Sequence, residues 1–121
     1  MKLKYFEINE FDDKNFPGSG KNMDKRFLKT LDKIREDSGV KMRITSGYRT
    51  KETNDSLKHS VPNSEHLNGL AVDVATVNSS ERAKIVYAAI KNSISRIGIG
   101  KSFVHLDMSE TKKPALWHYY K

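Results

Sequence analysis

Two apolar stretches of the sequence are each interrupted by a polar side chain that can bind a metal ion. Asp73 interrupts the run Leu70–Ala75, and His105 interrupts a second run further along the chain. A lone carboxylate within an apolar strand is costly to bury unless it is paired or bound to a metal. By strand alternation Ala71 and Ala75 share the face of Asp73, and these small side chains leave room above it.

A third candidate ligand, His66, comes from the polar loop before the first run, where Gly69 permits a tight turn. His66, Asp73 and His105 supply two imidazoles and one carboxylate, which are the three protein ligands of a catalytic zinc site with water in the fourth position. The chain has no cysteine, so any metal site must use such donors. Taken alone, His105 is also interpretable as a half-buried strand histidine, and Asp73 as an acceptor of backbone N–H groups. The metal hypothesis therefore depends on their occurrence together.

Three blocks follow one another along the chain: Ser46-Gly47-Tyr48-Arg49, then Ser64-x-His66-x-x-Gly69-x-Ala71-x-Asp73, then Phe103-Val104-His105-x-Asp107. In this order and spacing they resemble the zinc D-Ala-D-Ala carboxypeptidase family. That family includes L-alanyl-D-glutamate endopeptidases of phage, the vancomycin-resistance D,D-dipeptidases and the fold of the hedgehog signalling domain. The likeness runs from about residue 16 to residue 117, and it is strongest to short single-domain members from phages and bacteria.

The resemblance implies a zinc peptidase in which His66, Asp73 and His105 hold the zinc ion. It implies that Arg49 binds a substrate carboxylate or carbonyl, for which the planar guanidinium is suited. The alternative for Arg49 is a turn residue capped by local carbonyls. Ser64 is expected to hydrogen-bond the substrate or to position His66.

The general base departs from the family pattern. Many relatives carry an acidic residue three positions before the last zinc histidine, and here that position is Ser102. Asp107 shares a face with His105 by strand alternation and is the expected base; its alternatives are a partner behind His105 or a salt bridge to a lysine. His118 is a further candidate, although His59 and His118 are both interpreted as surface or edge residues.

These observations predict a zinc-dependent endopeptidase or carboxypeptidase that cleaves peptidoglycan stem peptides. One alternative is a non-catalytic module of the same fold that binds zinc and wall peptides. A second is a basic nucleic-acid-binding domain, which we do not expect because the sequence has no aromatic-basic stripe and no recognised reading motif. The formal net charge of +7 favours polyanionic partners, and wall polymers are among them.

The length of 121 residues, with 36% hydrophobic residues, predicts one domain over residues 1–121, which we expect to be a monomer. No apolar run approaches the roughly 18 residues needed to cross a bilayer, so no membrane insertion is expected. Residues 1–11 lack the apolar segment of a signal peptide, and none is predicted. Delivery to a cell wall would then require lysis or a virion.

Hydrophobic periodicity predicts an α+β fold with a small, mostly antiparallel sheet and two main helices, in keeping with the resemblance. The helices are expected over residues 22–37 and 78–92, with a short one over 50–58. The strands are expected over residues 40–45, 70–74, 94–99 and 103–108, with a weak edge strand over 1–11.

Overall fold

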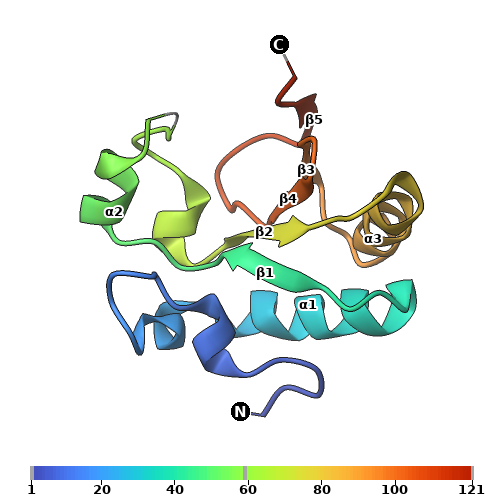
Figure 1. Cartoon of the computed structure of the whole chain (residues 1–121), viewed down its shortest axis with the longest axis horizontal. Helices are drawn as coiled ribbons and strands as arrows, with labels where there is room; N and C mark the ends of the chain where they lie inside the picture. Colours follow the sequence, from blue (N-terminus) through green and yellow to red (C-terminus); the bar gives the residue numbers. More distant parts are fainter. Residues whose placement is uncertain (1, 59, 121) are drawn as a thin grey trace.

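The computed structural model describes residues 2–58 and 60–120 and has an α+β architecture (Figure 1). One sheet has the strand order β1-β2-β4-β3-β5. Its strands are β1 (Arg43–Ser46), β2 (Ala71–Ala75), β3 (Arg96–Ile99), β4 (Phe103–Asp107) and β5 (Ala115–His118). Neighbouring strands are antiparallel except for β3 and β5, which are parallel. The expected fold class is confirmed.

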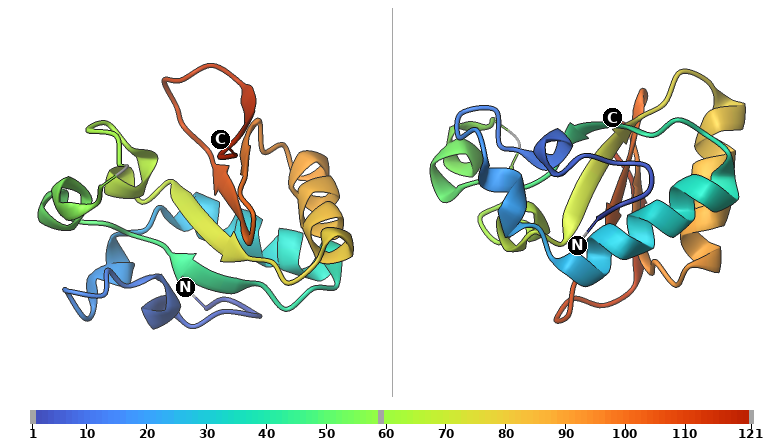
Figure 2. Two further views of the ribbon diagram at one scale, coloured as in Figure 1. Left: turned by 45° about the horizontal axis from the view of Figure 1, so that its top comes forward. Right: turned by 90° about the horizontal axis from the view of Figure 1, so that it is seen from below.

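Two long helices, α1 (Lys25–Ser38) and α3 (Ser79–Lys91), pack against each other beside the sheet (Figures 1 and 2). The shorter helices are α2 (Lys51–Ser56) and the 3-10 helices η1 (Ile8–Phe11), η2 (Ser19–Asn22) and η3 (Glu65–Asn68). In the part of the chain that the structure describes, none of these helices has the length and apolar character needed to cross a membrane.

The ends of both long helices are set by local sequence. The side chain of Asp24 accepts a hydrogen bond of 2.8 Å from the N–H of Phe27 and caps α1. Gly39, with φ of 69°, ends α1 in the left-handed conformation that glycine adopts without strain. Asn78 caps α3 by accepting a hydrogen bond of 2.8 Å from the N–H of Glu81. Both predicted helices are therefore confirmed.

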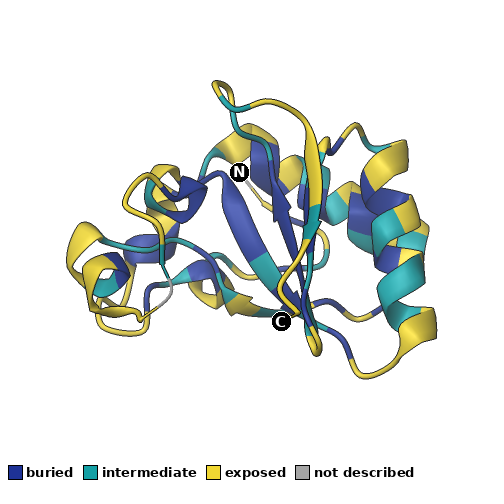
Figure 3. Cartoon of the chain, turned by 90° about the horizontal axis from the view of Figure 1, so that it is seen from above, coloured by how far each residue is buried: buried dark blue, intermediate teal, exposed yellow. Residues whose placement is uncertain are grey.

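One face of the sheet forms the core with α1 and α3. The inward side chains of the two central strands are fully buried: Val72, Val74, Val104 and Leu106. They belong to the same cluster as Phe27, Leu31 and Ile34 of α1 and Ile85 and Ala89 of α3. In Figure 3 the central strands are dark blue over most of their length, between elements with exposed outer surfaces. Because strand side chains alternate, Asp73 and His105 must point to the opposite face.

The structure corrects the expected edge strand at the N-terminus. The backbone N–H groups of Lys4 and Tyr5 donate to the carboxylate of Asp32 in α1, at 2.6 and 3.1 Å, instead of to a neighbouring strand. Residues 8–11 then form η1, which carries Phe11 into the core. Met1 lies outside the described residues.

Two further differences concern the C-terminal half. The C-terminal segment contains β5, which the sequence did not predict. A four-residue strand that is paired on one side leaves little periodic signal. In α3, the apolar residue Ile90 is exposed, whereas Ala88 is buried in the core. The buried face of α3 consists of Ile85, Ala88 and Ala89, so it contains fewer large apolar side chains than the helix as a whole.

Asp13 ties the N-terminal segment to the start of α2. Its carboxylate is almost fully buried and accepts hydrogen bonds from the N–H groups of Asn15 (2.9 Å) and Thr50 (2.8 Å) and from the hydroxyl of Thr53 (3.0 Å). Burial raises the pKa of Asp13, but these hydrogen bonds outweigh it and hold the pKa below its ordinary value. The ionised carboxylate therefore stabilises the fold next to Arg49.

We predict that Asp13→Asn lowers the free energy of unfolding at neutral pH by about 1–3 kcal/mol, since charge-assisted hydrogen bonds are lost. A depressed folded-state pKa means that this stabilisation is present above the ordinary pKa of about 3.9 and is lost as the pH falls through the folded value. Urea unfolding at pH 7 and pH 3 should therefore show a smaller difference between wild type and variant at pH 3. Glu52→Gln, which removes an exposed charge on α2, is the matched control. Equal effects of the two changes would contradict the prediction.

Candidate metal centre

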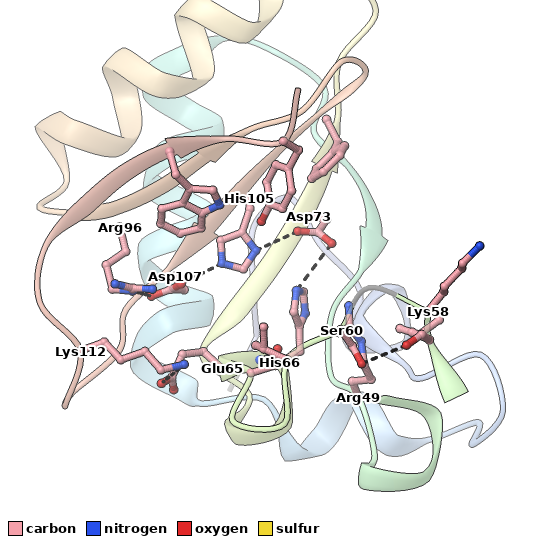
Figure 4. A pocket seen from close by; sticks show the side chains of 16 residues that line it. Arg49, Lys58, Ser60, Glu65, His66, Asp73, Arg96, His105, Asp107 and Lys112 are labelled. Atoms are coloured by element: carbon pink, nitrogen blue, oxygen red, sulfur yellow. Dashed lines mark hydrogen bonds and ion pairs between the residues drawn. The ribbon is translucent and has the colours of Figure 1, made fainter. Parts of the chain in front are cut away.

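His66, Asp73 and His105 come together on the face of the sheet opposite the helices (Figure 4). Nδ1 of His105 lies 3.0 Å from one carboxylate oxygen of Asp73, and Nε2 of His66 lies 3.5 Å from the other. One donor atom from each residue can be chosen so that all lie within 4.8 Å of one another. Two ligands on a tetrahedral zinc ion, each about 2.0–2.1 Å from it, are about 3.3–3.4 Å apart. The spacing and chemistry of the donors therefore fit a zinc ion.

The ring nitrogens that face away from Asp73 are both held by acceptors. Nδ1 of His66 lies 2.8 Å from the backbone carbonyl oxygen of Gly47, and Nε2 of His105 lies 2.7 Å from a carboxylate oxygen of Asp107. A carbonyl oxygen can only accept, and an ionised carboxylate can only accept. Each outer nitrogen therefore carries a proton, so when a metal ion replaces the proton of the inner nitrogen, that nitrogen offers its lone pair to the ion beside Asp73.

Charge is concentrated in this cluster. Burial raises the pKa of Asp73, but hydrogen bonds and charges from His105 and His66 outweigh it and hold the pKa well below the ordinary range. Burial lowers the pKa of His105, while Asp107 and Asp73 raise it above its ordinary value on balance. An ionised carboxylate between two imidazoles attracts a proton or a metal cation to the same place.

Strand register places Asp73 and His105 side by side. The two residues are direct partners across β2 and β4, and the row continues from His105 to Gly98 of β3 and from Gly98 to Trp117 of β5. A Cβ atom on Gly98 would lie 2.6 Å from the indole nitrogen of Trp117. The glycine thus lets the indole ring lean across β3, with its centroid 5.4 Å from that of His105.

The loop that carries His66 is fixed at both ends. The hydroxyl of Ser64 accepts a hydrogen bond of 3.2 Å from the N–H of His66 and caps η3. Gly69 ends η3 with φ of 69°, and a Cβ atom there would lie 2.5 Å from the carbonyl oxygen of Asn22. Ser64 is therefore found in a position that orients His66, one of its two expected roles, and it also lines the pocket.

Asp107 lies on the far side of the His105 ring from Asp73. One of its oxygens contacts Nε2 of His105, and the other accepts a hydrogen bond of 2.9 Å from Nε of Arg96. Burial raises the pKa of Asp107, but His105, the N–H of Ser109 and Arg96 lower it on balance. These contacts match the alternative role, a partner that orients His105, more closely than the expected role as general base. The base assignment itself stays a prediction.

Arg49 enters the pocket from the segment after β1. Its guanidinium donates hydrogen bonds to the side-chain oxygens of Asn54 (2.9 Å) and Ser46 (3.1 Å), both of which are neutral. Burial lowers the pKa of Arg49, and the charges of Asp73 and Asp13 raise it, but an arginine stays protonated at neutral pH. Both partners are side chains within five residues of Arg49 along the chain, so substrate binding and the turn-residue alternative both stay predictions. The positively charged guanidinium group of Arg49 is therefore held in place by two hydrogen bonds and lines the pocket.

These side chains line a pocket of about 600 Å³. Its wall also includes charged and polar side chains that sequence reasoning missed, among them Glu65, Arg96, Lys112 and Tyr119. Buried Glu65 accepts a hydrogen bond from Ser109 at 2.9 Å and pairs with Lys112 at 3.3 Å, which fixes the loop after β4. These charge pairs join distant parts of the chain, so their spacing in the sequence carries no signal.

Two residues that bear on the general base, His118 and Ser102, lie outside the pocket wall. His118 is not among the residues that line the pocket, and its ring stacks on Tyr120, with ring centroids 5.8 Å apart. Ser102 lies in the exposed turn between β3 and β4 and does not line the pocket. The identity of the general base, with His118 as the alternative to Asp107, stays a prediction. His59 lies outside the described residues.

Comparison with known proteins agrees with the geometry. No significant match to the chain is found among the curated proteins. The Peptidase M15 family model matches residues 2–107, which contain all three blocks of the sequence resemblance. This range includes the whole His–Asp–His cluster and Arg49, while the segment with β5 follows it. The chain belongs to the peptidase M15 family.

Proposed function

We propose that this protein is a zinc-dependent peptidase that cleaves peptide bonds in peptidoglycan stem peptides. The observation that supports it most is the fixed orientation of His66 and His105, whose inner nitrogens converge on Asp73. A zinc ion held by these three residues would lower the pKa of a water molecule and polarise the scissile carbonyl. Membership of a peptidase family supports the same reaction.

The other residues of the pocket have roles in binding and positioning. Arg49 would hold a carboxylate or carbonyl of the substrate, because its charge has no carboxylate partner within salt-bridge distance among the described residues. Asp107 would keep the proton of His105 on Nε2, and Ser64 would hold the backbone of His66. The surplus of 22 Lys and Arg over 15 Asp and Glu would favour approach to an anionic cell wall.

A non-catalytic module that binds zinc and wall peptides is the second candidate. It is favoured by one observation: each carboxylate of the described pocket wall, namely Glu65, Asp73 and Asp107, already has a polar partner. No unpaired carboxylate is thus ready to accept a proton from water. Turnover separates the two candidates.

We predict that the protein hydrolyses a synthetic stem peptide, that a chelator abolishes the activity and that zinc restores it. Mass spectrometry of the products would identify the bond and distinguish endopeptidase from carboxypeptidase.

His66→Ala, Asp73→Ala and His105→Ala should each lose the single zinc ion, measured by elemental analysis, whereas His118→Ala should keep it. Chelation should also lower the melting temperature, because the metal binds the folded state. Full zinc content in all three variants would refute the site.

Asp107→Asn distinguishes the two roles of Asp107. As the partner of His105, the carboxylate should matter for zinc affinity, and its loss should weaken zinc binding by roughly 10- to 100-fold. As general base, its loss should leave zinc binding intact and lower kcat by roughly 10²–10⁴-fold. We expect the first result in chelator competition, with kcat measured at saturating zinc. Unchanged zinc affinity together with a large fall in kcat would restore the general-base assignment.

Arg49→Lys tests the guanidinium fork. A lysine keeps the charge but cannot donate two parallel hydrogen bonds, so kcat/KM should fall roughly 10- to 100-fold, in line with about 1.5–3 kcal/mol for a hydrogen bond to a charged group. Zinc content and melting temperature should not change. Arg43→Lys, an equivalent change at an exposed position of β1, should have no effect. Wild-type kinetics in Arg49→Lys would exclude the proposed contact with substrate.

A further inference from the structure

The C-terminal segment completes the pocket although it follows the residues that the family match covers. The match ends at residue 107, and β5 begins at Ala115. β5 pairs in parallel with β3, and the N–H of Tyr119 extends the ladder with a hydrogen bond of 3.0 Å to the carbonyl oxygen of Ile99. The sheet therefore holds the segment in place through Tyr119.

Alternation along this segment turns Trp117 and Tyr119 toward the pocket, which both residues line. The Tyr119 ring packs against Phe103, with ring centroids 5.0 Å apart, and against Trp117 at 6.3 Å. Trp117 in turn lies against His105. A chain of ring contacts thus connects the phenol to the histidine of the metal centre and limits its position.

The hydroxyl of Tyr119 is a hydrogen-bond donor in a charged environment. Burial raises its pKa, and the charges of Asp73 and Asp107 add to this, while Trp117 and Arg49 act in the opposite direction. The phenol therefore keeps its proton at neutral pH. Among residues 2–58 and 60–120, that proton is not donated to any acceptor, whereas the guanidinium and ammonium groups of Arg96 and Lys112 are bound to the protein.

We propose that Tyr119 is a catalytic residue that donates a hydrogen bond to the scissile carbonyl oxygen as that oxygen gains negative charge. The inference rests on the proposed peptidase function. The proton stays on the phenol throughout, so no group is transferred. A donor fixed in place before the reaction stabilises the developing charge without reorganisation, and removal of one such donor costs roughly 10²–10³-fold in kcat. About half of Tyr119 is exposed, so a water molecule can partly replace the missing hydroxyl as a hydrogen-bond donor. We therefore expect a loss at the lower end of this range.

Tyr119→Phe tests the proposal, because it removes the hydroxyl and keeps the ring contacts with Phe103 and Trp117. We expect kcat on a stem peptide to fall about 100-fold with KM nearly unchanged, since the interaction forms only in the transition state. Zinc content and melting temperature should match wild type. Tyr87→Phe, at an exposed position of α3, is the matched control and should behave as wild type. Unchanged kcat in Tyr119→Phe, or a change in KM alone, would overturn the proposal.

Binding of a phosphinic peptide gives a second measurement that does not depend on turnover. Its tetrahedral anion mimics the charged transition state, so Tyr119→Phe should weaken its binding to the zinc-loaded protein by a factor similar to the loss in kcat. Calorimetry should show that the affinity for the corresponding product peptide, which has no tetrahedral anion, is the same in Tyr119→Phe and in wild type. Equal losses for both ligands would mean ground-state binding and would overturn the catalytic role.

If wild type cleaves stem peptides and Tyr119→Phe is equally active, only this inference fails. If zinc-loaded wild type cleaves none, the proposed function fails as well.

Discussion

The geometry of the pocket depends on the two hydrogen bonds that hold the outer nitrogens of its histidines. The carbonyl oxygen of Gly47 fixes the ring of His66, and the carboxylate of Asp107 fixes the ring of His105. Without these acceptors each imidazole could rotate or keep its proton on the inner nitrogen, which would leave that nitrogen without a lone pair for a metal ion beside Asp73. The acceptors come from different elements, so the cluster exists only in the folded chain.

The sheet supports these contacts through its register. Asp73 and His105 are cross-strand partners, and the flanking residues in β2 are Ala71 and Ala75, which leave space above the pair. Gly98 continues the same row without a side chain, and Trp117 uses that space. A shift of one residue between β2 and β4 would turn the candidate metal ligands of these strands into the apolar core. The buried valines on the opposite face make such a shift unfavourable, so core packing and site geometry stabilise the same register.

The pocket wall also holds three carboxylates, those of Glu65, Asp73 and Asp107, in a protein with a net charge of +7. These carboxylates are compensated in two ways. Asp107 pairs with Arg96, and Glu65 pairs with Lys112, so both are neutralised by basic side chains. Asp73 instead contacts two histidines, which are neutral unless protonated or bound to a cation. A buried carboxylate without a permanent cation is unfavourable. This difference distinguishes the candidate metal ligand, Asp73, from the two carboxylates that shape the wall.

The sequence by itself determined the fold class, both long helices, the central strands and the three candidate ligands. Helix caps and alternation are local, and a polar residue within an apolar run is visible without any tertiary contact. The sequence could not establish the role of Asp107, because alternation gives its face but not which side of the His105 ring it contacts. It also missed β5, Arg96 and Tyr119. Their positions follow from parallel pairing with β3 and from ion pairs between residues distant along the chain. Only tertiary packing could decide those contacts, since a short edge strand and an isolated charge carry no periodic signal of the partner they will meet.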